Sequence, residues 1–304
     1  MKILLDTDIG YGTDADDAIA LAYLLLQPEC ELLGVTTLGL HSEWRADLAA
    51  TVCRDLGQSQ IPVVAGADRP LYANPYWREN PIRPWPGAEA SPFTPNQALE
   101  FLRATIRAHP GEITLITIGQ FTNLAMLLLV DPDAVAMLKG VVSMGGRMNY
   151  PADQPQGECN VILDPIAAGI AFQRLGEQLL LLPIDAVRGH SLSESEVVRM
   201  LDRDDRDAVR QTCWGWEETR KGKKGVGLAD PMTCAMVFDP RLVNCAPGTV
   251  RLTLHDHAVP GGEPFEDDEV IGITAFAESA NGPHSVVRSI HPEQAHAHLL
   301  EVFR

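Results

Sequence analysis

Basic residues are scarce in this sequence of 304 residues. Lysine and arginine together number 24 against 41 aspartates and glutamates, so the formal net charge is −17 and the isoelectric point is near 4.8. A chain this acidic repels the phosphates of a nucleic acid and the headgroups of an anionic membrane. The composition therefore argues against both as partners.

Long hydrophobic runs and paired cysteines are also missing. No apolar stretch reaches the roughly 18 residues that a membrane-spanning helix needs. The six cysteines form no C-x-x-C pair, and most lie in apolar or helical contexts, as reduced thiols do. Met1 and Lys2 run directly into an apolar segment, which leaves no room for a signal peptide. These absences predict a cytoplasmic protein.

The chain also lacks internal repeats, low-complexity tracts and linkers that separate domains, so one domain is expected over residues 1–304. Its 45% hydrophobic content is enough for a large core. Up to about residue 190, strand-like apolar runs alternate with helical segments. This alternation predicts an α/β fold with a mostly parallel central sheet flanked by helices, and an active site at the carboxyl ends of the strands.

The periodicity of apolar residues places the individual elements. Strands are predicted at 3–5, 32–37, 62–66, 113–119, 140–146 and 178–184, and helices at 18–26, 43–56, 96–108, 122–129 and 165–172. One or two helices are expected over 193–221 and another over 232–237. Beyond Val250 the pattern changes to short β-like pieces and a terminal segment at 295–303, while 74–92 is interpreted as a loop or lid.

The strongest chemical signal is a cluster of five aspartates within the twelve positions 6–17, directly after the first apolar run. Strand, glycine-containing loop and helix follow one another here, so the carboxylates belong at the carboxyl end of the first strand. Carboxylates packed this closely repel one another, and a bound cation relieves the repulsion. Oxygen ligands on a flexible loop suit Ca²⁺ or Mg²⁺ better than zinc. The alternative is a solvated acidic turn in which one aspartate caps the helix.

Four further segments are expected at the same edge of the sheet. Ile118 offers a main-chain carbonyl at a strand end, and Thr122 is expected to cap the next helix. Glu158 and Asn160 stand two residues apart, which places them on one side of an extended segment. Two Asp-Pro helix starts are, taken alone, more typical of caps than of ligands: Asp164-Pro165 and Asp230-Pro231.

In combination these segments resemble the calcium-dependent nucleoside hydrolases, the inosine-uridine-preferring nucleoside N-ribohydrolases. The similarity covers nearly the whole chain in the family's order. The matching motifs are Leu5-Asp6-Thr7-Asp8-Ile9-Gly10, Asp16-Asp17-Ala18, Gly34-Val35-Thr36-Thr37, Pro62-Val63-Val64-Ala65-Gly66, Gly119-Gln120-Phe121-Thr122-Asn123-Leu124-Ala125, Met144-Gly145-Gly146, Glu158-Cys159-Asn160, Asp164-Pro165, Pro183-Ile184-Asp185 and Ala229-Asp230-Pro231. The resemblance implies hydrolysis of the N-glycosidic bond of ribonucleosides by an enzyme that forms a homodimer or homotetramer.

The resemblance also implies a metal site. Carried over residue by residue, it expects a Ca²⁺ held by Asp8, Asp17, the carbonyl of Ile118 and Asp230, with Asp8 also the general base on a metal-bound water. Excess negative charge around the sugar suits a reaction that passes through an oxocarbenium-like ribose. The metal would lower the pKa of its water and orient the ribose diol.

The remaining implied contacts are to the ribose. Asp16 is expected at the 2′-hydroxyl, and Glu158 and Asn160 at the 5′- and 3′-hydroxyls. Asn149 is a further 5′-hydroxyl candidate, although its spacing to Glu158 is longer than usual. Hydrogen bonds to every hydroxyl would make the enzyme specific for ribose, because an analogue lacking one leaves a buried polar group unpaired.

The sequence departs from the family pattern in three places. The first loop is longer and contains an extra acid, Asp14, which is interpreted as a solvated turn residue in preference to a spare group near the metal. Leu40 and His41 stand where an asparagine is usual. Ala229 stands where many members carry a histidine that protonates the leaving base, a role worth ~10²- to 10⁴-fold in rate.

Several side chains are candidates to replace that histidine. Trp77 and Trp85 lie in one segment that flanks the family's base pocket, and Trp214 and Trp216 in another. Stacking between indoles makes a purine easier to protonate, which favours purine substrates, and Trp77 is the best candidate. For Trp214 and Trp216, packing against the core is the preferred interpretation. His41 and His190 are alternative acids, although a lone histidine is more often structural.

Two other functions remain open at this point. A phosphatase of the haloacid dehalogenase type also begins with Asp-x-Asp after its first strand, as in Asp6 and Asp8, but its downstream Thr/Ser, Lys and acidic pair are not supplied here. A non-catalytic nucleoside- or ribose-binding protein could retain the metal site and lack turnover. Retention of Asp8, the implied base, argues against that second alternative.

Overall fold

The centre of the protein is one large β-sheet. The computed structural model describes residues 1–72, 82–86, 91–148, 157–219, 225–255 and 271–304. The strands of the large sheet are β1 (Lys2–Thr7), β2 (Glu31–Thr37), β3 (Val63–Ala65), β4 (Ile113–Thr117), β5 (Gly140–Met144), β6 (Leu179–Leu182), β9 (Val243–His255), β10 (Ile271–Glu278) and β11 (His284–Ile290). A separate two-stranded pair consists of β7 (Ser191–Leu192) and β8 (Val226–Gly227).

The large sheet is mostly parallel. Its nine strands lie in the order β10-β9-β11-β6-β5-β4-β1-β2-β3. Neighbouring strands from β3 to β11 run parallel, whereas β9 is antiparallel to both β11 and β10. The predicted α/β fold with a mostly parallel central sheet is confirmed.

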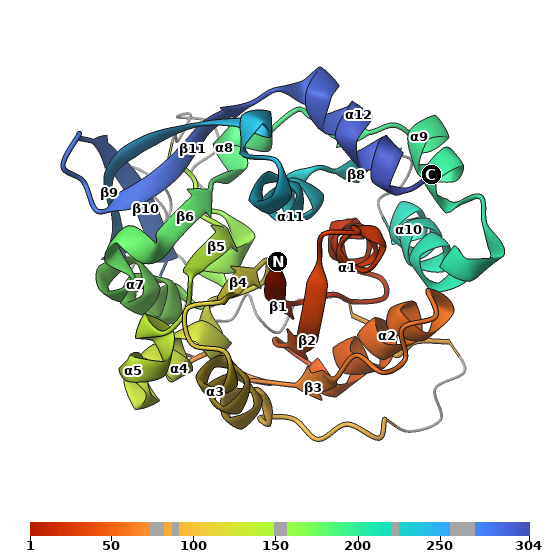
Figure 1. Cartoon of the computed structure of the whole chain (residues 1–304), viewed down its shortest axis with the longest axis horizontal. Coiled ribbons are helices and arrows are strands. Elements are labelled where there is room, and N and C mark those ends of the chain that lie inside the picture. Colours follow the sequence, from red (N-terminus) through yellow and green to blue (C-terminus); the bar gives the residue numbers. More distant parts are fainter. Residues whose placement is uncertain (73–81, 87–90, 149–156, 220–224, 256–270) are drawn as a thin grey trace.

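Helices cover both faces of this sheet (Figure 1). In chain order they are α1 (Asp16–Leu26), α2 (Ser42–Asp55), α3 (Ala98–Ala108), α4 (Thr122–Val130), α5 (Pro132–Ala136), α6 (Cys159–Ile162), α7 (Pro165–Arg174), α8 (Ile184–Val187), α9 (Glu194–Leu201), α10 (Asp207–Thr219), α11 (Ala229–Phe238) and α12 (Pro292–Val302). Among the described residues there are also three 3₁₀ turns, η2 (Gly176–Gln178), η3 (Asp204–Arg206) and η4 (Pro240–Leu242).

Strand β1 shows why both faces are covered. Side chains alternate along a strand, so Ile3 and Leu5 face one side and Leu4 faces the other. Ile3 and Leu5 belong to a core built with α1, α2 and α11, whereas Leu4 belongs to a second core built with α3, α4 and α7. All three side chains are fully buried. A strand that is apolar on both faces is typical of a parallel sheet between two helical layers.

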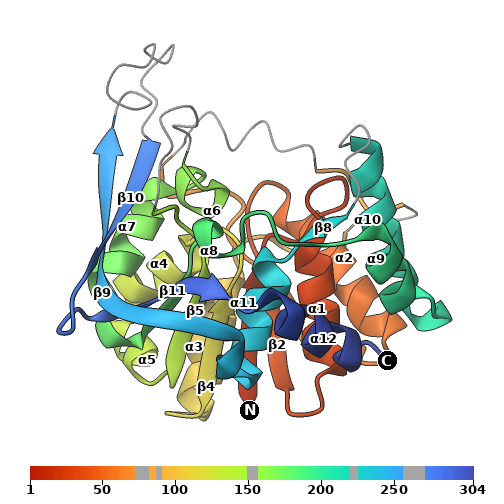
Figure 2. The same ribbon diagram turned by 90° about the horizontal axis from the view of Figure 1, so that it is seen from above.

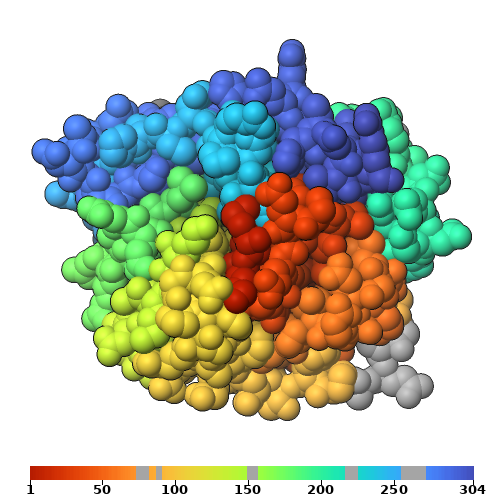
Figure 3. All heavy atoms as spheres, in the orientation of Figure 1, coloured from red at the N-terminus to blue at the C-terminus, as the bar shows by residue number. Residues whose placement is uncertain are grey.

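The carboxyl ends of the parallel strands meet at one edge of the molecule. Figure 2 shows the loop from β1 to α1 at this edge and the amino terminus at the opposite edge. In Figure 3 the first residues, in dark red, reach the surface at the centre of the face that lies away from the loop. Within the described ranges, no helix is long and apolar enough to cross a membrane.

The second half of the chain differs most from the sequence prediction. The short β-like pieces expected beyond Val250 are two long strands, β9 and β10, which pair over eight residues at the edge of the sheet. Helix α11 begins three residues earlier than predicted. The short elements α6, α8, β7 and β8 were not predicted, because segments of two to four residues carry too little periodicity.

Of the three helix caps considered at Thr122, Asp164 and Asp230, only one forms. Asp164 caps α7 as predicted, since its side chain accepts a hydrogen bond from the Ala167 N–H at 3.1 Å. Thr122 does not cap α4, because the N-cap position belongs to Phe121. The Thr122 hydroxyl donates instead to the carboxylate of Asp164 at 2.7 Å, which ties α4 to α7. Asp230 lies inside the first turn of α11 and makes no cap bond.

Candidate active site

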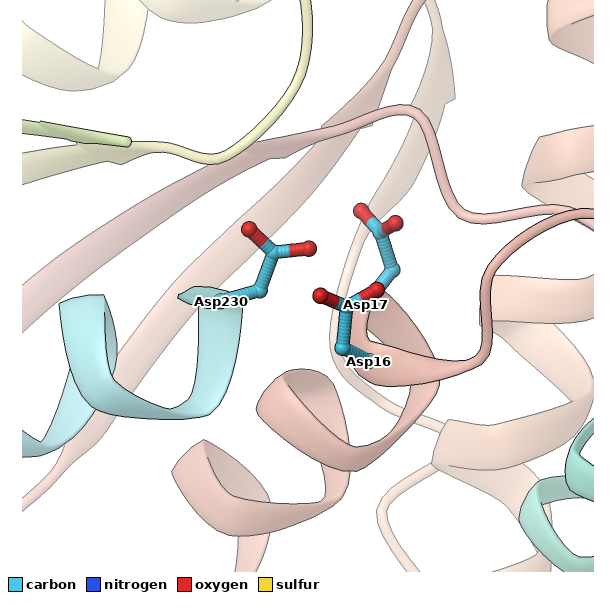
Figure 4. Close-up of side chains that lie close together, drawn as sticks. All are labelled: Asp16, Asp17 and Asp230. Carbon is cyan, nitrogen blue, oxygen red and sulfur yellow. The ribbon is translucent and has the colours of Figure 1, made fainter. Parts of the chain in front are cut away.

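Three carboxylates converge from two helix starts. Asp16 and Asp17 are the first two residues of α1, and Asp230 is the second residue of α11. One ligand oxygen from each lies within 4.8 Å of the others, and all three residues are buried. Figure 4 shows the three side chains directed toward one another from the two helices. Oxygen donors at this spacing fit a hard divalent cation.

The electrostatics of the cluster are dominated by burial and by repulsion between carboxylates. Burial raises the pKa of Asp16, Asp17 and Asp230 well above the usual range, and repulsion among the neighbouring carboxylates raises it further. Protonation is one way to relieve such repulsion, and a divalent cation is another. The alternative of a solvated acidic turn is wrong for this cluster, because the three acids are buried. The part of that alternative in which an aspartate caps the helix is also wrong, because the N-cap of α1 makes no side-chain hydrogen bond.

The cluster forms one wall of a cavity of about 200 Å³. The lining residues are Asp8, Thr13, Asp14, Asp16, Asp17, Ile118, Met144, Glu158, Cys159, Asn160, Ile184, Ala229 and Asp230. Seven of the nine residues expected in the site thus lie around one cavity. The other two, Trp77 and Asn149, lie outside the described residues.

Asp8 is placed by two neighbours. Its carboxylate accepts a hydrogen bond from the Gln120 Nε2 at 3.2 Å. Gly119 runs so close that a Cβ atom there would lie 2.8 Å from the Asp8 nitrogen, so a side chain at this position would push Asp8 away. Burial raises the pKa of Asp8, and the Arg45 guanidinium opposes that rise. Asp8 is half-buried and therefore open to the cavity.

Arg45 is a buried cation beneath the first loop, and sequence reasoning missed it. The guanidinium is fully buried and donates to the main-chain oxygens of Asp8, Ile9 and Leu40. An arginine on a helix is normally expected in solvent, so its position in the sequence gives no signal. The side chain braces the loop that carries Asp8 and puts positive charge behind the carboxylates.

Asp6 is turned into the core, away from the cavity. Its Oδ1 accepts hydrogen bonds from the Thr36 hydroxyl at 2.5 Å and from the Asn123 amide at 2.7 Å, and the residue is 1% exposed. Burial raises its pKa to about 7. A phosphatase nucleophile must reach its substrate, so this burial contradicts the dehalogenase-type alternative.

Glu158 and Asn160 both line the cavity, but their backbone conformation differs from the predicted one. Glu158 is extended, whereas Asn160 lies inside α6, so the expected single extended segment is wrong. The Glu158 carboxylate caps α6 by accepting from the Asn160 N–H at 2.8 Å and also accepts from the Gly146 N–H at 2.9 Å. Burial raises the pKa of Glu158 to about 7, and these hydrogen bonds oppose the rise.

The side chain of Asn160 reaches the predicted carbonyl ligand. Its Nδ2 donates to the Ile118 oxygen at 3.0 Å and to the Met144 oxygen at 3.3 Å. A carbonyl oxygen has two lone pairs, so that of Ile118 can accept this bond and still bind a cation. Asn160 therefore fixes the direction of the carbonyl as well as lining the cavity.

Asp14 belongs to the cavity wall, so its interpretation as a solvated turn residue is wrong. It lines the cavity, and its charge raises the pKa of Asp16. Its Oδ1 also accepts from the Ala15 N–H at 2.9 Å. The insertion in the first loop therefore adds negative charge beside the three-carboxylate cluster.

The other aromatic and histidine side chains that were candidates to assist the leaving base lie in different places. Trp214 does not line the carboxylate cavity; it is 51% exposed and lies against the Arg210 guanidinium at 5.4 Å. His41 stacks on Trp44 with ring centroids 3.7 Å apart, which is a packing role. His190 lines a neighbouring cavity. The side chain of Trp216 lies outside the described part of the structure.

Trp85 packs away from the carboxylates. Its ring meets Tyr11 edge-on with centroids 5.3 Å apart. Tyr11 in turn lies against α10, where a Cβ atom on Gly215 would come 2.8 Å from the Tyr11 ring. The pair therefore fastens the first loop to α10.

The donor set supports a metal site on its own chemistry. Asp16, Asp17 and Asp230 offer carboxylate oxygens, Asp8 lines the same cavity, and Ile118 offers a carbonyl oxygen. Hard oxygen donors of this kind are preferred by Ca²⁺ and Mg²⁺, whereas zinc favours nitrogen and sulfur.

Comparisons with known proteins identify the family of the chain. Residues 3–294 match the protein family described as inosine-uridine preferring nucleoside hydrolase. An uncharacterized protein of Schizosaccharomyces pombe is 31% identical over 256 residues, which cover 79% of this chain and 81% of that protein. Uridine nucleosidase 1 of Arabidopsis thaliana is 27% identical over 269 residues, covering 83% of this chain and 78% of the relative.

A solved structure supports the fold. The purine-preferring ribonucleoside hydrolase from Gardnerella vaginalis superposes with a TM-score of 0.75 at 20% identity, and the match covers 100% of this chain and 98% of that one. At this identity the likeness concerns the arrangement of the sheet and helices.

Proposed function

The chain belongs to the inosine-uridine preferring nucleoside hydrolase family, and we propose that it hydrolyses the N-glycosidic bond of ribonucleosides with a Ca²⁺ ion at Asp8, Asp17, the Ile118 carbonyl and Asp230. The observation that carries the proposal is the convergence of Asp16, Asp17 and Asp230 within 4.8 Å in a cavity that also contains Asp8. The proposal is supported by this cavity because its lining includes the residues that the family resemblance implies as metal ligands.

Ca²⁺ bound in this cavity supplies the Lewis-acid chemistry by which water becomes a nucleophile near neutral pH. The Asp8 carboxylate is the base that takes the proton of the attacking water, and Gln120 keeps that carboxylate in place. The surrounding carboxylates stabilise positive charge on the ribose as the bond to the base breaks.

The remaining side chains of the cavity hold the sugar. Asp16 accepts from the 2′-hydroxyl, Asn160 binds the 3′-hydroxyl and Glu158 the 5′-hydroxyl, as the family resemblance implies. The amide of Asn160 is already oriented by its bonds to Ile118 and Met144, and Glu158 by its cap of α6. Groups held in this way lose little freedom when substrate binds.

We also propose a preference for purine ribosides. The relatives divide, since one is named a uridine nucleosidase and another a purine-preferring hydrolase. Support in this chain comes from Trp77 in the sequence and from a second cavity of about 560 Å³ beside the carboxylates, which is roomy enough for a bicyclic base. The proposed cytoplasmic location and the homodimer or homotetramer rest on the resemblance, and sedimentation measurements test the assembly.

Release of ribose from a panel of inosine, adenosine, guanosine, uridine and cytidine tests the function. We expect turnover of ribosides, abolition by a chelator and recovery on addition of Ca²⁺. Binding of Ca²⁺ to the chelator-treated protein should also raise its melting temperature, because a ligand that binds only the folded state stabilises it. Full activity in excess chelator would contradict the metal site, and inactivity on every riboside would contradict the proposed reaction.

A further inference from the structure

A second cavity adjoins the carboxylate cavity. Its volume is about 560 Å³, and it shares four wall residues with its neighbour, namely Asp14, Asp16, Ile184 and Ala229. Sites for small molecules typically measure about 300–1,000 Å³. The carboxylate cavity, at about 200 Å³, is too small for a whole nucleoside but not for its sugar. With a ribose among the carboxylates, the second cavity would be the adjoining space available to the base.

The far wall of the second cavity carries basic and polar side chains. Arg188, His190 and Ser191 come from the turn that follows α8. His190 is half-buried and is the only histidine among the described residues that line either cavity. The charged groups that share this cavity with it are Asp14 and Asp16 on the sugar side and Arg188 on its own turn.

Strand pairing places the residue after His190 opposite a glycine that lies beside Asp16. Ser191 pairs with Gly227 across the two-stranded β7–β8 pair. Gly227 in turn lies beside Asp16, since a Cβ atom on it would be 3.6 Å from the Asp16 Oδ2. The backbone N–H of His190 donates to the Val187 oxygen at 3.0 Å, which closes the turn. The imidazole therefore sits on a braced turn one residue from a strand that borders the sugar site.

We propose that His190 is the general acid that protonates the departing base in the second cavity. This inference rests on the proposed nucleoside hydrolysis. When the C1′–N bond breaks, its electron pair stays on the base, and the imidazolium gives a proton to a ring nitrogen of that base. The attacking water forms the new C1′–O bond and loses its proton to Asp8. Asp8 then releases its proton to solvent, and solvent restores the proton on His190.

Substrates that differ in their leaving group isolate this role. A purine or pyrimidine departs poorly as an anion, whereas nitrophenolate departs without a proton. His190→Gln should lower kcat/KM for inosine and uridine by ~10²- to 10⁴-fold and change that for 4-nitrophenyl riboside less than about threefold.

His109→Gln is the matched control. His109 is half-buried like His190, but it lies at the opposite edge of the sheet, with its Nδ1 3.0 Å from the Lys2 Nζ. This variant should keep wild-type rates on all three substrates. Melting temperatures with and without Ca²⁺ establish that both variants fold and bind the metal.

Three results would overturn the inference. An equal loss on all three substrates would make His190 a structural or sugar-binding residue, and an unchanged rate on inosine would make it dispensable. In both cases the wild-type enzyme remains active, so the proposed reaction stands. Inactivity of the wild type on every riboside would overturn the reaction and, with it, the role of His190.

Discussion

The buried acid Asp131 and the cluster of three buried acids, Asp16, Asp17 and Asp230, have opposite surroundings. Asp131, before α5, meets the Arg107 Nη2 at 2.6 Å and the Arg103 Nε at 2.9 Å, and these guanidinium groups hold its pKa well below the usual range. For Asp16, Asp17 and Asp230, burial and mutual repulsion raise the pKa, and the charge of Arg45 opposes that rise at Asp17.

The difference separates a structural acid from a binding site. Asp131 caps α5 and joins it to α3, so its charge is balanced by the protein itself. The three-carboxylate cluster leaves its charge unbalanced, which costs stability unless a cation arrives from solution. A buried acid paired with two arginines supports the fold, whereas a cluster of buried acids with raised pKa values that lines a cavity is evidence for function.

The largest expected effect comes from replacing one acid of the carboxylate cavity, Asp8, and comparing the result with replacement of Asp131. Asp8→Asn should lower kcat by at least ~10³-fold on every riboside, even in excess Ca²⁺, because the base is lost. Asp131→Asn should leave kcat unchanged and lower the melting temperature, because it removes ion pairs that hold α5 against α3. Ribose release and thermal unfolding measure the two effects. Turnover of Asp8→Asn at the wild-type rate would contradict its role as the base.

A smaller effect is expected from the side chains proposed to hold the sugar. Asn160→Ala and Glu158→Gln should each cost about 1–3 kcal/mol of transition-state stabilisation, since each leaves a polar partner unpaired. The loss should be similar for purine and pyrimidine ribosides, as judged by kcat/KM on inosine, adenosine, uridine and cytidine. If only one class of base were affected, the pair would read the base and not the ribose.

The smallest expected effect is on stability as a function of pH. In the folded chain without metal, Asp6 and Glu158 have pKa values of about 7, against 3.8 and 4.5 for the free side chains. The folded state thus binds these protons more tightly than the unfolded state, so the stabilisation is complete below about pH 4 and lost as pH rises through about 7.

Thermal unfolding in the presence of a chelator tests the direction in which stability changes with pH. The melting temperature should fall from pH 5 to pH 8, and Ca²⁺ should restore more of it at pH 8, where deprotonated carboxylates bind the metal. Asp131 has the opposite effect on stability. Because its pKa is lowered in the folded state, it stabilises the fold at pH values above 3.8, and this stabilisation is lost only as the pH falls into the acid range. A melting temperature that rises steadily from pH 5 to pH 8 in the chelator would contradict the raised pKa values of Asp6 and Glu158.

Much of the site could be predicted from local sequence. Asp16 and Asp17 follow an apolar run and a glycine loop, and Asp230 precedes a proline at a helix start, so each could be assigned to a strand end or a helix start. The burial of Arg45 and the inward turn of Asp6 could not, because both depend on contacts with residues far along the chain, such as the bond from Asn123 to Asp6. The wrong geometry assigned to Glu158 and Asn160 has a local cause, since a four-residue helix leaves no periodic signal.

The sequence by itself determined the alternation of strands and helices, the mostly parallel sheet and the acidic character of the first loop, because apolar periodicity and turn residues act over a few positions. Only the tertiary structure decided that α11 packs beside α1. Buried alanines on both helices, including Ala18, Ala22 and Ala235, leave room for that approach, and the approach brings Asp230 within 4.8 Å of Asp16 and Asp17. The three acids form one site because two packed helices begin at the same edge of the sheet.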